Sequence, residues 1–160
     1  MRRWMIVFLL VSIFALVGCG VLPDSAPEAP SPELLTPIAE VRGGIEGTFT
    51  IRMGIANNSS REIRESEDFE GRWQLLDASG AVRAAGHVYH LGSLGPEESR
   101  YPLAWESELE PGSYTLLWGA PSIGSVVVEF EAEVSNGAAN VQGMTSAPSD
   151  DFPPGDGFVE

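Results

Sequence analysis

The sequence has one cysteine, two histidines and no lysine in 160 residues. A single cysteine excludes a disulfide within the chain, so a folded domain must depend on its apolar core. Nine arginines stand against 23 acidic residues, and the net charge is −14. A chain this acidic is repelled by nucleic acid and by anionic lipid headgroups, so we expect no nucleic-acid partner.

Long apolar runs are also scarce, and the clearest one lies near the first residue. Arg2 and Arg3 precede residues 5–17, which carry no charge. This run is shorter than the roughly 20 residues that a helix needs to cross a bilayer. A charged start followed by a short apolar centre is typical of an export signal, and we predict a signal peptide over residues 1–18.

The apolar run ends at the only cysteine, in the stretch Leu16-Val17-Gly18-Cys19. This stretch resembles the lipobox of bacterial lipoproteins. The resemblance implies that diacylglycerol is joined to the thiol of Cys19, that cleavage falls between Gly18 and Cys19, and that the new amino group is often acylated. An ordinary secretory signal with a chance cysteine is the alternative.

The predicted lipid determines where we expect the protein to be. Two or three acyl chains anchor a protein stably, whereas a single chain binds only marginally. We therefore expect the protein to be held by its N-terminal lipid on the extracytoplasmic face of a bacterial cell membrane. In a source with two membranes, the outer membrane is an alternative.

Composition separates a central domain from two polar ends. Residues 19–41 form a predicted tether, which begins with the lipidated Cys19 and stays extended because each proline restricts itself and its preceding residue. Its prolines are Pro23, Pro27, Pro30, Pro32 and Pro37. Residues 136–160 are rich in Gly, Ala, Ser, Pro and Asp, and we predict a disordered acidic tail there. The domain is then predicted over residues 42–135.

Within this domain, apolar and polar residues alternate with the period of a β-strand. The clearest runs are FTIRMGI at 49–55, FEGRWQLLD at 69–77 and SVVVEFEAEV at 125–134; shorter or weaker ones lie at 81–90, 101–105 and 114–118. Pro102 indicates an edge strand. Six to seven such strands predict a single all-β domain, an immunoglobulin-like sandwich of two antiparallel sheets. A small closed barrel is the alternative.

The order of turns and strands is similar to that of a known family. A strand ending in Asn-Asn-Ser-Ser is followed by WQLLDASGAV, then LGPEESRYPLAW, then LEPGSYTLLW. This succession resembles the BsuPI-type intracellular proteinase inhibitor domain, and the resemblance implies an immunoglobulin-like sandwich. Gly95 and Pro96 stand in the reverse order, and the tryptophan of that family after the Asp-x-x-Gly turn is missing. We therefore place no inhibitory residue on this sequence.

The side chains that carry most enzyme chemistry are few. His87 and His90, three positions apart, would point to opposite faces of a strand, which suits neither a shared metal nor a catalytic pair. Glutamates alternate at 106–110 and at 129–133. Calcium needs about six to eight oxygens converging from a loop, so we interpret both ladders as solvated faces. We predict no enzyme activity, no metal and no cofactor.

The tryptophans and one glycine-rich stretch remain as candidates for binding. Trp73, Trp105 and Trp118 share stripes with other apolar residues, which favours the core. The stretch WGAPSIG at 118–124 has few side chains, and its first residues are our candidate interaction loop. The residues of that loop are Trp118, Gly119, Ala120 and Pro121.

These observations favour a membrane-anchored surface lipoprotein whose β-sandwich, without enzyme activity, contacts an unidentified protein of the cell envelope. A proteinase inhibitor of the BsuPI type is the alternative that the resemblance suggests. An envelope hydrolase is the third and weakest interpretation.

Overall fold

A computed structural model describes residues 34–64 and 69–153. The predicted signal peptide, Cys19 and the first part of the predicted tether lie outside the described residues. The described residues form eight β-strands, and none of them belongs to a helix long and apolar enough to cross a membrane.

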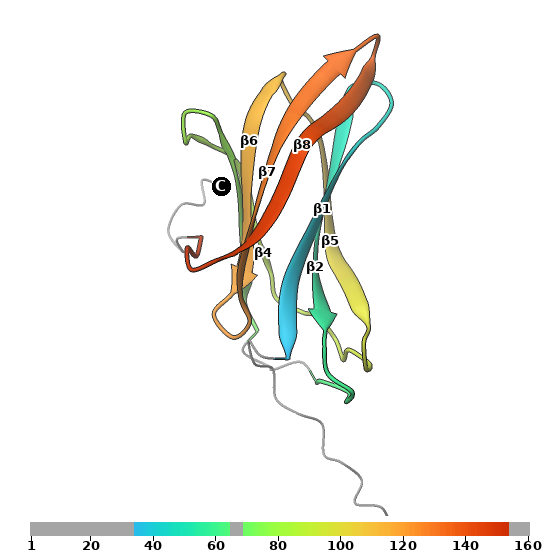
Figure 1. The fold of residues 1–160 in the computed structure, drawn as a ribbon, viewed down its shortest axis with the longest axis vertical. Coiled ribbons are helices and arrows are strands. Elements are labelled where there is room, and N and C mark those ends of the chain that lie inside the picture. The colour runs from blue at the N-terminus through green and yellow to red at the C-terminus, as the bar shows by residue number, and fades with distance from the viewer. Residues whose placement is uncertain (1–33, 65–68, 154–160) are drawn as a thin grey trace, which may run out of the picture.

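The eight strands form two antiparallel sheets that face each other (Figure 1). Their bounds are β1 Leu35–Gly43, β2 Thr48–Asn57, β3 Gly71–Asp77, β4 Val82–Val88, β5 Ser99–Glu108, β6 Gly112–Ala120, β7 Gly124–Ser135 and β8 Ala138–Ser149. One sheet has the order β1-β2-β5 and the other has the order β4-β3-β6-β7-β8. The predicted all-β sandwich is therefore confirmed, with eight strands in place of six or seven.

The connections between the sheets are those of an immunoglobulin-like sandwich. The chain crosses from one sheet to the other after β2, again after β4 and again after β5. Strand β4 pairs with β3, as an added strand does in variable-type immunoglobulin domains. Strand β8 extends the second sheet beyond β7. The predicted edge position of the strand around Pro102 is confirmed, because β5 is the last strand of its sheet.

Two boundaries predicted from composition are wrong. Strand β1 begins inside the predicted tether at residues 19–41, and its Leu35 and Val41 belong to the core. Strand β8 occupies much of the predicted disordered tail at residues 136–160 and pairs with β7 along its length. Both segments are ordered by backbone hydrogen bonds to a neighbouring strand, which composition does not reveal.

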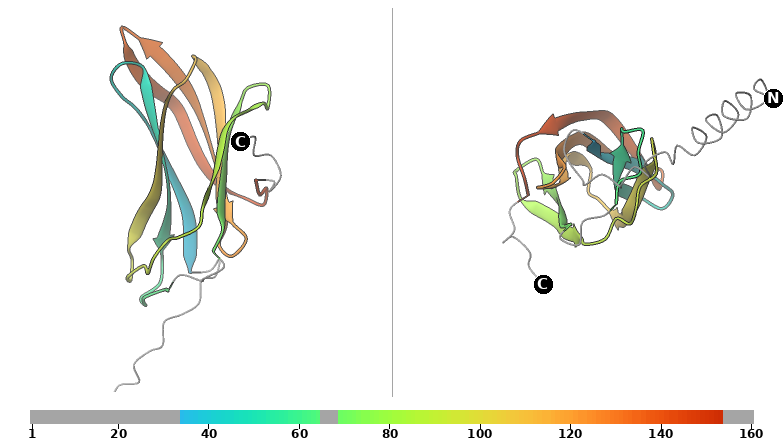
Figure 2. Two further views of the ribbon diagram at one scale, coloured as in Figure 1. Left: turned by 180° about the vertical axis from the view of Figure 1, so that it is seen from behind. Right: turned by 90° about the horizontal axis from the view of Figure 1, so that it is seen from below.

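The two ends of the sandwich differ, and they are named here as they stand in Figure 1. The upper end carries the short turns at 44–47, 78–81, 109–111 and 136–137. The lower end carries the start of β1, the end of β8 and the longer connections from β2 to β3 and from β4 to β5 (Figures 1 and 2). The described chain therefore enters and leaves its strands at the lower end.

The apolar stripes of the predicted strands face the space between the sheets. Phe49, Ile51, Met53 and Ile55 are fully buried, as the alternation predicts. In the stripe at 101–105, Leu103 and Trp105 are half-buried and pack against the core, whereas Tyr101 is an exception, because the register of β2 and β5 shifts beside Gly54.

At this shift, Tyr101 lies against the backbone of Gly54, on the outer side of the sheet, because Gly54 is flanked by the inward-facing Met53 and Ile55. The guanidinium of Arg52 stands 4.4 Å from the centre of the Tyr101 ring. Tyr101 is therefore a surface residue stacked under an arginine.

Trp118 links the two sheets across the core. Its indole Nε1–H donates a hydrogen bond to the carbonyl oxygen of Gly54 at 2.8 Å, from β6 to β2. The ring also packs on Gly71, where a side-chain carbon would lie 2.5 Å from the indole. The bond joins two strands that lie in different sheets, so it fixes the position of one sheet over the other.

A substitution of Trp73 tests this description of the core. It is 4% exposed, and its ring centre lies 5.7 Å from that of Trp105. We expect Trp73→Ala to lower the free energy of unfolding by about 3–5 kcal/mol, a large part of the ~5–15 kcal/mol typical of a domain. A chemical denaturation curve measures the change. The control Val82→Ala, at a half-exposed position, should change it by less than about 0.5 kcal/mol. An unchanged midpoint for Trp73→Ala would place this residue outside the core.

Candidate functional site

The structure does not form the predicted interaction loop. Trp118, Gly119 and Ala120 are buried residues of β6, and only Pro121 of the four lies exposed in the turn to β7. Gly119 is a glycine because Ser125 of the neighbouring strand approaches it closely; an added side-chain carbon would lie 2.6 Å from the Cα of that serine. The prediction was wrong because a glycine required by close packing was interpreted as a sign of an open loop.

The two histidines lie in different settings. His87 belongs to β4, and its Nδ1 lies 3.1 Å from the carboxylate of Glu70, while its ring stacks on Tyr89. His90 lies beyond the end of β4 and is exposed. A hydrogen bond from Arg72 is the main reason that the pKa of Glu70 is lowered, although burial opposes this shift. The group around His87 is thus an ion-paired cluster on the sheet surface.

The glutamate ladders lie where the alternation predicts, on solvent-facing positions of β5 and β7. Glu106 accepts a hydrogen bond from Thr50, and Glu133 accepts one from Gln142. Within residues 34–64 and 69–153, no group of three or more metal-ligating side chains is arranged to hold an ion.

An apolar groove of about 510 Å³ separates the lower half of β1 from the end of β8. Its walls include Pro37 on β1 and Pro148 on β8. Neither proline has an N–H to donate, so each interrupts the strand edge on which an added peptide strand would have to pair. The groove therefore lacks the continuous row of donors that strand addition uses.

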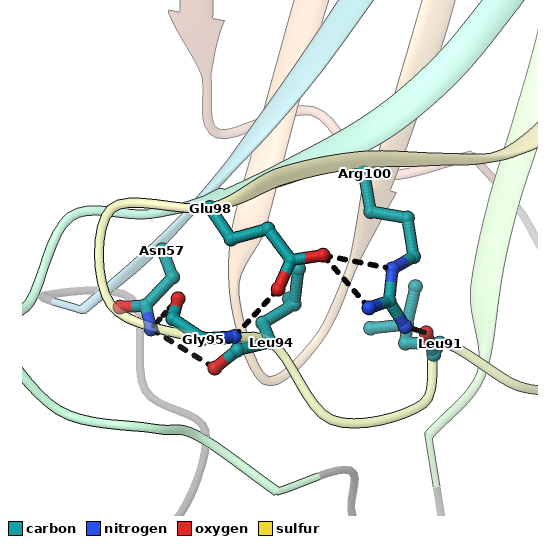
Figure 3. A network of polar contacts seen from close by, with 6 residues as sticks. All are labelled: Asn57, Leu91, Leu94, Gly95, Glu98 and Arg100. Carbon is teal, nitrogen blue, oxygen red and sulfur yellow. Dashed lines mark hydrogen bonds and ion pairs between the residues drawn. The ribbon is translucent and has the colours of Figure 1, made fainter.

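A polar network organises the loops of the lower end (Figure 3). Asn57 is 1% exposed, and its side-chain amide donates to the carbonyls of Arg61, Leu94 and Gly95 at 2.8, 3.2 and 2.8 Å. Its Oδ1 accepts hydrogen bonds from the backbone N–H and the hydroxyl of Ser59. One buried side chain thus joins the two longer connections of the lower end.

Glu98 and Arg100 complete this network (Figure 3). The carboxylate of Glu98 accepts the backbone N–H of Gly95 at 2.7 Å and pairs with Arg100 at 2.7 Å. Arg100 in turn donates to the carbonyl of Leu91 at 3.1 Å. The hydrogen bond from Gly95, followed by that from Arg100, lowers the pKa of Glu98. These contacts hold the loop rigid. The polar side chains of Asn57, Glu98 and Arg100 are therefore engaged in structural hydrogen bonds.

A second hollow, of about 260 Å³, lies near the upper end, where β4 and β5 are the edge strands of their sheets. We call it the Trp105 pocket. It is lined by Arg83, Trp105, Ser107, Glu108, Leu109, Glu110 and Tyr114. An aromatic ring and charged side chains meet here in one hollow, which makes this pocket the candidate binding site of the described residues.

Tyr114 fixes one wall of the Trp105 pocket. Its hydroxyl donates to the carbonyl of Glu110 at 2.9 Å, which is the tyrosine corner of immunoglobulin-like domains. Burial raises the pKa of Tyr114, so the hydroxyl keeps its proton at neutral pH. The sequence signal for this corner is Pro-Gly-x-Tyr at the start of a strand, with Glu110 just before the turn.

Asp77 holds Arg83, another residue that lines the Trp105 pocket. Its carboxylate accepts hydrogen bonds from Ser79 and from the backbone of Ala81, and it pairs with the Nε of Arg83 at 2.7 Å. The hydrogen bond from the Ser79 hydroxyl is the largest of the causes that lower the pKa of Asp77 to about 2. Arg83 is therefore held by an ionised partner on its own side of the pocket.

In comparisons with known proteins, no family model matches this chain, and no curated protein and no solved structure matches it either.

The lower-end network yields a test at Asn57. We expect Asn57→Ala to cost about 1–3 kcal/mol, because buried carbonyls lose their donor. Asn57→Asp should cost more, because a carboxylate would face the same carbonyls. Denaturation measures stability, and hydrogen exchange of the Leu94 amide, which bonds to Ile63, measures the loop.

The matched control is Asn58→Ala, because Asn58 is exposed and, within the part of the chain that the structure describes, its side chain bonds only to the hydroxyl of Thr36. This change should stay within about 0.5 kcal/mol. Equal stabilities for the variants at 57 and 58 would show that the network does not hold the loops together.

Proposed function

We propose that this protein is a membrane-anchored surface lipoprotein whose β-sandwich makes protein-protein contacts at the cell envelope, without enzyme activity. The lipid on Cys19 holds it at the extracytoplasmic face of the membrane. The sandwich is the part that meets the partner.

The position of β1 is the observation that carries this proposal. Strand β1 begins at Leu35 at the lower end, so residues 20–34 connect Cys19 to that end (Figure 1). An extended chain of this length spans about 45 Å at ~3.1 Å per residue. Under the proposal, the lower end faces the lipid, and the upper end with its short turns is farthest from it. A partner that approaches from outside then meets the upper end first.

The anchor is tested at Cys19. In cells of the source, we expect the processed wild-type chain to begin at Cys19 and to carry diacylglycerol on its thiol, since the thiol is the attachment point. Mass spectrometry of the N-terminal peptide measures this. Cys19→Ala should leave the precursor uncut and without lipid, and Ser25→Ala should behave like the wild type. A processed, lipid-free wild-type protein in the soluble fraction would contradict the anchor.

The contact is tested by cross-linking in intact cells. A photoreactive residue in place of Ile45, which is 81% exposed at the upper end, should give a discrete product with another envelope protein. The same residue in place of Ser60, exposed at the lower end, is the matched control and should give less of it. Equal products from both positions would contradict the orientation, and no product from either would contradict the contact.

Inhibition of a proteinase is the second candidate function. The loop that contains Gly95 and Pro96 is part of the resemblance to the BsuPI-type domain, and the network of Asn57 and Glu98 holds it rigid. A rigid loop loses little entropy when it binds, which favours an inhibitor. The two functions differ in one assay, because only an inhibitor removes peptidase activity in proportion to its amount.

A further inference from the structure

The charge around the Trp105 pocket is unbalanced. Glu108 and Glu110 line it, and among the described residues neither carboxylate is held in an ion pair or a hydrogen bond. Arg83 lines the same pocket, but its guanidinium pairs with Asp77. The charges of Arg83 and Asp77 offset each other, and two negative charges remain.

The aromatic wall of the pocket is fixed in place. Trp105 is half-buried, and its ring packs against the core residue Trp73 with 52° between their planes. The inner side of Trp105 therefore belongs to the core, while its remaining surface lines the pocket. A ring that is held by the core offers a binding surface without a large loss of side-chain freedom.

The segment that carries the two glutamates is also held in place beside the pocket that it lines. Leu109 lies between Glu108 and Glu110 in sequence and is 8% exposed, so it anchors this segment to the core. The tyrosine corner fixes the backbone of Glu110 through the hydroxyl of Tyr114. The pocket that contains the Trp105 ring is thus also lined by two glutamates whose carboxylates are unpaired, on a backbone that Leu109 and Tyr114 hold in place.

We propose that the Trp105 pocket binds an arginine side chain of the partner protein. The guanidinium lies against the indole of Trp105 and pairs with the carboxylates of Glu108 and Glu110. Arginine fits because its planar cation both stacks on aromatic rings and donates to carboxylates. The net charge of −14 attracts a basic partner from a distance. This inference rests on the proposed function, since it names the chemistry of the partner that the sandwich contacts.

The test is a titration of the whole chain, purified in detergent micelles, with N-acetyl-arginine amide. The indole N–H resonance of Trp105 should shift in a saturable way in the millimolar range, as expected for a single-residue probe. N-acetyl-citrulline amide has nearly the same shape without the charge, and it should bind about fivefold more weakly, a loss within the range expected when two exposed ion pairs are removed.

Two double variants with the same change in net charge separate the pocket from the overall field. Glu108→Gln with Glu110→Gln should raise the dissociation constant about fivefold, on the same estimate for two exposed ion pairs. Glu129→Gln with Glu131→Gln, on exposed positions of β7, should change it by less than about twofold. All four positions are exposed, so both proteins should stay folded, as circular dichroism would check.

Three results would overturn the proposal: no shift of the Trp105 indole, equal binding of the citrulline probe, or equal losses in the two double variants. The last would show a general attraction between an acidic chain and a cation. The anchor and the cross-link are measured separately, so a discrete cross-link from position 45 together with a failed titration would leave the proposed function standing and reject only this pocket.

Discussion

The hydrogen bond from the Trp118 indole to the carbonyl of Gly54 is the contact on which the relation of the two sheets depends. It joins β6 to β2, the two strands that a disulfide joins in antibody domains. The only cysteine of this chain lies outside the described domain, so a buried aromatic residue stands where the disulfide would be. The bond itself contributes about 0.5–1.5 kcal/mol, compared with ~2–4 kcal/mol for a disulfide. The burial of the large ring supplies the rest, and for this reason Gly71 has to remain without a side chain.

This arrangement explains which parts of the fold could be predicted from the sequence. Strands β2, β3, β6 and β7 each bury one face under the other sheet, so burial imposes the alternation that identified them. Strand β8 was missed because most of its side chains are exposed, and it is held through its backbone to β7. Strand β1 does carry a readable alternation, with Leu35, Pro37 and Val41 buried, but its proline made the segment look like part of the tether.

The candidate site was harder to predict, for a geometric reason. The residues of the Trp105 pocket come from β4, from the end of β5 and from the start of β6, in two different sheets. The alternation along a strand indicates which face of the sheet a side chain is on, but it does not indicate which strand of the other sheet packs against that face. Trp105 was therefore assigned to the core, which is correct for one side of its ring. Gly119 was assigned to an exposed loop, but it is a buried strand residue whose lack of a side chain makes room for Ser125.

The placement of the arginines distributes the net negative charge unevenly between the two ends of the sandwich. Arg72, Arg83 and Arg100 each pair with a nearby carboxylate, and Arg61 and Arg64 lie at the lower end. The glutamates of β5 and β7 that have no such arginine lie largely toward the upper end. In the proposed orientation the lower end lies next to the membrane, and this distribution keeps part of the repulsive charge away from the lipid. The same distribution places the unpaired carboxylates where the proposed basic partner would meet them first, so the proposed anchor and the proposed chemistry of the pocket agree on one orientation.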